Sequence, residues 1–243
     1  GISDPPVVIM GHGFAAEKTF GLTAFSERFA ENGIASFAFD YRNFGASDGT
    51  PRNLVRPRRH LQDWEAAVTH VRSLKDVDGS RTALWGSSFS GGHVLVTAAR
   101  VKGISAVVSQ VPFVDGLDFA RRMGFRYMMK ALSAGLRDVF RVATLRDRHT
   151  VPVVGKPGDL AVLNTPDAWD GYMSLVPEES GWKNACPAAF LLTGALYRPI
   201  RSAKRIRCPV LLMPAEEDAI ISLKAAKRTA SRIHDSRLVP VRA

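Results

Sequence analysis

Residues 83–92 read Ala-Leu-Trp-Gly-Ser-Ser-Phe-Ser-Gly-Gly. An apolar run ends there in a turn of small residues, and a second apolar segment begins at His93. A strand, a sharp turn and a helix in this order form a nucleophile elbow, which holds Ser88 in a strained conformation with its hydroxyl exposed. Gly86 and Ser90 lie two positions to either side, where the tight crossing of the chain requires small residues. A serine-glycine loop without function would look similar, so the motif needs support from the rest of the chain.

Buried strands and amphipathic helices alternate on both sides of this turn. Continuous apolar runs predict strands over residues 6–10, 34–39, 81–85 and 104–111. Helical periodicity predicts helices over residues 17–32 and 61–74 and a further helix after the elbow. This alternation predicts an α/β fold, a doubly wound and mostly parallel sheet with flanking helices. Ligands of such sheets bind beyond the carboxyl ends of the strands, where Ser88 is expected.

The alternation stops in the second half of the chain and then resumes. Residues 113–207 contain helical stretches separated by a segment rich in proline and glycine, and they hold more than half of the excess positive charge. A strand at 209–213, a helix at 222–233 and a last strand at 237–241 follow. We therefore expect a core made of residues 1–112 and 208–243, with an inserted, largely helical cap at 113–207. The core is expected to lack the first strands that such folds usually have.

Composition limits the functional classes that the chain can belong to. The 243 residues carry a formal net charge of +10, but no nucleic-acid-binding motif accompanies it, so we expect no nucleic acid partner. Because no run of 18 apolar residues occurs, we expect no membrane partner. Cys186 and Cys208 fit neither a metal site nor a disulfide framework, which favours a reducing, cytoplasmic compartment. We expect no metal and no cofactor.

A serine hydroxyl becomes a nucleophile only with help from other groups. A base must take its proton, an acid must orient that base, and hydrogen-bond donors must face the developing oxyanion. The backbone N–H of Phe89 follows the elbow serine directly, and the loop after the first strand offers the backbone N–H of Phe14. Asp218 follows a late strand and is the candidate acid, preferred over its neighbour Glu217.

Four motifs in this order and spacing resemble the α/β-hydrolase superfamily, in particular the dienelactone hydrolase-like and Xaa-Pro-peptidase-like serine esterases and thioesterases. The matching stretches are residues 11–14, 39–49, 86–92 and 209–221. The resemblance implies that Ser88 is the nucleophile, that Asp218 is the acid, and that the N–H groups of Phe14 and Phe89 form the oxyanion hole. A cap before the acid strand is also common in this superfamily.

The catalytic histidine of that superfamily, like its first strands, has no evident counterpart here. It follows the last strand, where the sequence reaches Ala243. The histidines present are His12, His60, His70, His93, His149 and His234. We expect His60 and His70 at the surface and His12 to shape its loop. Three explanations stay open: the chain is trimmed before a histidine just beyond Ala243, the protein has lost the base, or the base comes from the cap, as His149, or from another subunit.

These observations predict a serine hydrolase that cleaves an ester, thioester or lactone through an acyl-enzyme on Ser88. The alternatives are an acyltransferase that uses the same nucleophile and a non-catalytic binding protein on this fold. The substrate is expected to be a small acyl compound, and basic residues of the cap favour an anionic one. Those basic residues are Arg121, Arg122, Arg126, Lys130, Arg137 and Arg141. The sequence leaves the oligomeric state open.

Overall fold

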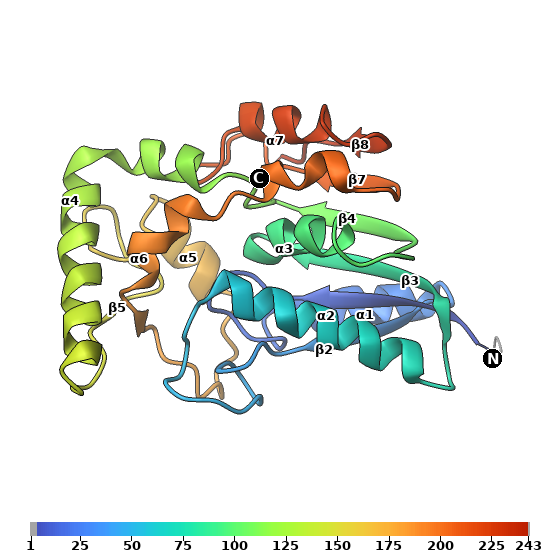
Figure 1. Ribbon diagram of the computed structural model, residues 1–243, viewed down its shortest axis with the longest axis horizontal. Helices are drawn as coiled ribbons and strands as arrows, with labels where there is room; N and C mark the ends of the chain where they lie inside the picture. The colour runs from blue at the N-terminus through green and yellow to red at the C-terminus, as the bar shows by residue number, and fades with distance from the viewer. Residues whose placement is uncertain (1–3, 243) are drawn as a thin grey trace.

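A six-stranded, fully parallel sheet forms the centre of the computed structural model, which describes residues 4–242 (Figure 1). Its strand order is β2-β1-β3-β4-β7-β8. The strands are β1 (Pro6–Gly11), β2 (Ala35–Phe39), β3 (Asp78–Ser87), β4 (Ala106–Gln110), β7 (Val210–Met213) and β8 (Ser236–Leu238). The predicted fold class is confirmed, and all strands that were expected from the apolar runs are present.

The first strand shows why the sheet is covered on both faces. Three helices cover the two faces of the sheet around β1, namely α1 (Leu22–Glu31), α2 (Pro57–Ser73) and α3 (Phe89–Ala98). Because side chains alternate along a strand, Val7 and Ile9 join the cluster formed with α2 and α3. Val8 and Met10 join a second cluster on the α1 face. Both sets are buried, which explains why the strand is apolar throughout.

Two helices begin at other residues than the apolar pattern predicts. The helix expected from residue 17 starts only at Leu22, because Gly21 adopts a left-handed conformation with φ 78° and separates it from the turns before it. The helix expected from residue 61 starts earlier, at Pro57, where proline fits the first turn because no N–H is needed there. Apolar periodicity locates the buried face of a helix better than it locates its ends.

The segment between β4 and β7 lies beyond the carboxyl ends of the strands, on the left of Figure 1. It contains α4 (Gly116–Ala143), β5 (Thr150–Val151), α5 (Ala168–Met173), β6 (Cys186–Pro187), α6 (Phe190–Thr193) and three single-turn 3₁₀ helices. The segment is largely helical, as expected of the cap. A kink at Gly124, with φ 77°, divides α4 into two parts.

The chain returns to the edge of the sheet after β7. The helix expected at 222–233 is α7 (Leu223–Ala230), and the hydroxyl of Ser222 caps it by accepting a hydrogen bond from the Ala225 N–H. Beyond β8, Val241 pairs with Ala215 in a parallel bridge, so the last described residues run beside the loop that follows β7. None of the helices within residues 4–242 is long and apolar enough to cross a membrane.

Candidate functional site

The turn after β3 has the strained geometry of a nucleophile elbow. Ser88 has φ 55° and ψ −113°, a conformation that L-residues other than glycine rarely adopt. Its backbone N–H donates to the carbonyl oxygen of Gln110 and its carbonyl oxygen accepts from the N–H of Phe113, each at 2.9 Å. A Cβ at Gly86 would lie 2.4 Å from the carbonyl oxygen of Ser90, so the crossing requires glycine there. The end of β4 therefore holds the elbow in place.

Ser90 contributes more than small size to this turn. Its hydroxyl is fully buried and donates to the carbonyl oxygen of His12, and it also forms a hydrogen bond with the hydroxyl of Tyr41. Trp64 Nε1 of α2 donates to the same tyrosine oxygen at 2.7 Å. This buried network joins the elbow helix to the loop after β1. The local sequence around Ser90 does not predict this network, because its members are distant from one another along the chain.

The loop after β1 lies close to the elbow, because a Cβ at Gly13 would lie 3.4 Å from the Cβ of Ser88. The rings of Phe14 and Phe89 pack edge to face with centroids 5.4 Å apart. Within residues 4–242, neither the N–H of Phe14 nor that of Phe89 donates a hydrogen bond. Both N–H groups are therefore without an acceptor among the described residues.

Two side chains, one in α5 and one between α5 and β6, hold this loop from the other side. The Tyr172 hydroxyl donates to the carbonyl oxygen of Phe14 at 2.9 Å, and Trp182 Nε1 donates to the carbonyl oxygen of Ala15 at 2.8 Å. Ala15 itself has φ 50°, a conformation that needs such support. The sequence contains no signal for these contacts, because they depend on how the cap folds back over the sheet.

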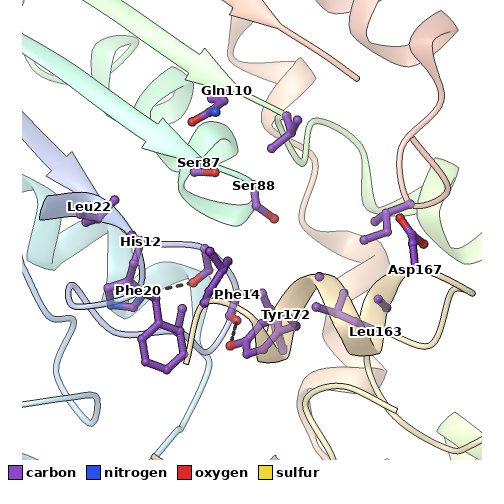
Figure 2. A pocket seen from close by; sticks show the side chains of 18 of the residues that line it. His12, Phe14, Phe20, Leu22, Ser87, Ser88, Gln110, Leu163, Asp167 and Tyr172 are labelled. Atoms are coloured by element: carbon purple, nitrogen blue, oxygen red, sulfur yellow. Dashed lines mark hydrogen bonds between the residues drawn. The ribbon is translucent and has the colours of Figure 1, made fainter. Parts of the chain in front are cut away.

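A cavity of about 440 Å³ opens beside Ser88, with the cap as one wall (Figure 2). Its walls are mostly apolar and come from the β1 loop, α1, the elbow and residues 163–175 of the cap. They include Phe14, Phe20, Leu22, Phe25, Trp85, Leu163, Tyr172 and Leu175. Among the described residues, Asp167 is the one carboxylate that lines this cavity, and no lysine or arginine lines it. The basic cap residues identified in the sequence therefore lie elsewhere.

Asp218 lies on the loop after β7, next to the cavity wall. One carboxylate oxygen accepts hydrogen bonds from the N–H groups of Ile220 and Ile221, at 2.7 and 3.0 Å. Ile220 lines the cavity. Burial raises the pKa of Asp218 above its usual value, although these two hydrogen bonds lower it. Glu217 beside it is exposed, as expected of a residue without a role in the site.

The prediction for His60 is wrong, because this side chain is only 2% exposed. It lies in the first turn of α2 on the face that packs on α3, where its Nδ1 is 3.2 Å from Nε2 of His93. The other nitrogen of His93 is 2.5 Å from the hydroxyl of Tyr197. Burial lowers the pKa of His60 well below 6.5 and that of His93 to about 3. His70 is exposed, as predicted.

His12 shapes its loop, in agreement with the prediction. It is buried, its Nδ1–H donates to the carbonyl oxygen of Gly13 at 3.0 Å, and its Nε2 lies 3.9 Å from Asp40. Burial lowers its pKa to about 4. His149 and His234 do not line the cavity. The histidine expected beyond Ala243 lies outside the described residues.

Comparison with known proteins gives one consistent result. The model of the family described as "Alpha/beta hydrolase family" matches residues 7–241. The quorum-quenching protein AidA of Acinetobacter baumannii is 39% identical over 226 residues, which cover 93% of this chain and 74% of that protein. The thiohydrolase aneE of Aspergillus aculeatus is 35% identical over 115 residues, which cover 47% of this chain and 36% of that protein.

A solved structure shows the same fold over the whole chain. The alpha/beta hydrolase GrgF from Penicillium sp. sh18 superposes with a TM-score of 0.83 at 22% sequence identity. The match covers 100% of this chain and 83% of that one. At this identity the likeness concerns the fold, and the cap segment is included in it.

Proposed function

The chain belongs to the alpha/beta hydrolase family, and from this premise we propose that it is a serine hydrolase that cleaves an ester, thioester or lactone through an acyl-enzyme on Ser88. The observation that carries the proposal is the strained backbone of Ser88 at the floor of an apolar cavity. A backbone held at φ 55° by flanking hydrogen bonds costs folding free energy, and such strain is typical of functional sites. Similarity to a protein named a thiohydrolase supports thioesters as one substrate class.

In the proposed reaction the Ser88 oxygen adds to the carbonyl carbon of the substrate. The serine proton moves to a base, and the carbonyl oxygen becomes negatively charged. We propose that the N–H groups of Phe14 and Phe89 stabilise this oxyanion, a role supported by their lack of other acceptors among residues 4–242. The tetrahedral intermediate collapses, the leaving group takes the proton, and water later releases the acyl group from Ser88 by the same steps.

Asp218 is the proposed acid that orients the base. Its carboxylate is held by two backbone N–H groups at the carboxyl end of β7, on the same side of the sheet as Ser88. We propose that the base is a histidine oriented by this carboxylate. Val241 pairs with Ala215, and the Glu216 N–H donates to the Val241 carbonyl oxygen at 3.0 Å. Val241 therefore lies beside the loop that carries Asp218.

The cavity supports a small acyl substrate whose acyl group is apolar. Aromatic and aliphatic side chains bind such a group by removing its surface from water. An anionic acyl group would meet Asp167 and no cation within the described walls. We therefore propose that any preference for anionic substrates acts on the part that stays outside the cavity, near the basic cap residues.

Labelling with a fluorophosphonate probe tests the nucleophile directly. The full-length protein should be labelled, and Ser88→Ala should abolish both labelling and ester hydrolysis. Ser87→Ala is the matched control, because Ser87 also lines the cavity but precedes the elbow residue. Labelling that persists in Ser88→Ala, or an unlabelled full-length protein, would contradict the proposal. Product analysis with an added alcohol acceptor distinguishes hydrolysis from acyl transfer.

The division into a core and a cap and the cellular location are part of the same proposal. We assign residues 1–112 and 208–243 to the hydrolase core and 113–207 to the cap, because the latter lie between β4 and β7 and cover the cavity. We also propose a cytoplasmic location. Cys186 and Cys208 are both free and buried, which agrees with a reducing compartment.

A further inference from the structure

Helix α4 carries a row of large apolar side chains on its exposed side. Phe125 is 78% exposed, Leu136 54% and Leu145, just after the helix, 98%. Most of the large apolar side chains that are exposed in the described part of the protein lie between Phe125 and Leu145. In Figure 1 this helix forms the outer edge of the cap, away from the sheet. Apolar side chains gathered in this way mark an interaction surface.

The spacing of these side chains identifies the shape of the partner. Phe125, Met129, Leu132, Leu136 and Val139 follow one another at intervals of four, three, four and three residues. This is the heptad spacing of a seam that packs against one other helix. Buried residues on the opposite side of α4 pack against the protein's own cap, and no residue between 4 and 242 covers the seam. An α-helix is therefore expected to cover it.

We propose that the partner is α4 of a second copy, packed antiparallel about a two-fold axis near Ala134. In this register Leu132 lies against Leu136 of the partner subunit, and Met129 lies against Val139 of the partner subunit. Phe125 meets Ala143 of the partner subunit. The two-fold axis produces each of these three residue pairs twice, as an isologous interface requires. Large side chains face smaller ones at both ends, and leucines fill the centre.

The residues beside the seam also suit this arrangement. The two Ser133 residues face each other at the axis, where small side chains allow the helices to approach. Arg126 lies next to Phe140 of the partner subunit, a pairing of a cation with an aromatic ring. Lys130 and Arg137 lie further around the helix from the seam than Arg126 and Ser133 do, and both are exposed to solvent. Like charges are therefore not brought together across the interface, although the exposed side of α4 is basic.

The surface is large enough for a stable dimer. Each exposed apolar side chain of the row offers on the order of 100 Å². Together they reach several hundred square ångströms, close to the ~800 Å² per subunit that specific interfaces bury. The active-site cavity does not include this face of α4, so the dimer is independent of the proposed reaction.

Analytical ultracentrifugation of the full-length protein tests the proposal. The sedimenting mass should be twice that of one chain, and Leu132→Glu combined with Leu136→Glu should halve it. Leu196→Glu is the matched control, because Leu196 is 72% exposed but lies outside α4, and this variant should stay dimeric. Circular dichroism identifies any variant that fails to fold. Since the four glutamates would meet at the axis, their effect should weaken at pH 4.

Cross-linking tests the antiparallel register. A short bismaleimide should join two copies of Ser133→Cys and should leave Lys130→Cys uncoupled, because residue 130 points away from the partner. A native protein that sediments as a monomer overturns the proposal, including the case in which it binds vesicles of anionic phospholipid through the basic side of α4. A dimer that survives the double glutamate substitution also overturns it.

Discussion

The hydroxyl of Tyr172 donates a hydrogen bond of 2.9 Å to the carbonyl oxygen of Phe14. The tyrosine belongs to α5 of the cap, and Phe14 belongs to the loop after β1, 158 residues earlier. Figure 2 shows this contact at the edge of the cavity, close to Ser88. The cap therefore forms one wall of the cavity and also fixes the loop that carries the proposed oxyanion donor.

Removal of this hydrogen bond should slow the chemical step. Tyr172→Phe keeps the ring in the cavity wall but frees the Phe14 carbonyl, so the N–H of Phe14 loses its alignment. We expect kcat to fall about fivefold, which corresponds to ~1 kcal/mol, with little change in KM. Tyr127→Phe is the control, since it removes a similar cap hydrogen bond, to the carbonyl oxygen of Ala161. Equal loss of kcat in both variants would show that the effect is not specific to the loop.

The carboxylate of Asp218 should be essential for turnover and unimportant for folding. Asp218→Asn keeps an acceptor for the N–H groups of Ile220 and Ile221 but cannot stabilise a positively charged base. By analogy with other catalytic triads, kcat should drop on the order of 10³- to 10⁴-fold. Glu217→Gln changes the neighbouring exposed carboxylate and should leave kcat unchanged. Steady-state kinetics with an activated ester checks both, and an active Asp218→Asn would remove this residue from the mechanism.

The elbow should not tolerate a methyl group at Gly86. The added Cβ of Gly86→Ala would lie 2.4 Å from the Ser90 carbonyl oxygen, which is backbone and cannot move aside cheaply. We expect a loss of about 1–3 kcal/mol in the free energy of unfolding, as is usual for overpacking. At Gly171 in α5 an added Cβ meets no atom within 4 Å, so Gly171→Ala should be neutral or slightly stabilising. Urea denaturation measures both variants.

The buried histidines should make the folded state sensitive to mild acid. Burial lowers the pKa of His12 to about 4 and that of His93 to about 3, whereas an unfolded chain titrates near 6.5. As the pH falls below 6.5, the unfolded state binds protons that the folded state does not, so stability decreases. Each histidine should contribute about 1.4 kcal/mol per pH unit between pH 6 and 4.5.

The carboxylates also titrate in acid, so the contribution of one histidine has to be separated from theirs. Comparing the pH dependence of the free energy of unfolding in the native protein and in a His93 variant does this. Urea denaturation of the native protein and of His93→Gln between pH 7 and 5 should give free energies of unfolding whose pH slopes differ by about 1 kcal/mol per pH unit on average, because the unfolded imidazole is only partly protonated above pH 6. Identical slopes for the native protein and His93→Gln would contradict the assignment of a neutral, buried imidazole.

His60 shows where inference from the sequence failed. It stands at the start of a helix among arginines, a setting that indicates a surface residue. In the structure that helix starts four residues earlier than predicted, and its first turn packs on α3. Polar side chains can be buried when distant partners satisfy their hydrogen bonds, and those partners cannot be read from local periodicity.

The parallel sheet, the order of its main elements and the elbow at Ser88 could all be predicted from the amino-acid sequence. These features depend on local patterns, namely apolar runs, small residues at fixed spacing and turn-forming glycines, which act over a few residues. The tertiary structure alone decided how the cap closes the cavity, which backbone carbonyls Tyr172 and Trp182 hold, and that Ser90 is part of a buried network. These contacts join residues far apart in the chain, so they arise only when the apolar faces have packed together.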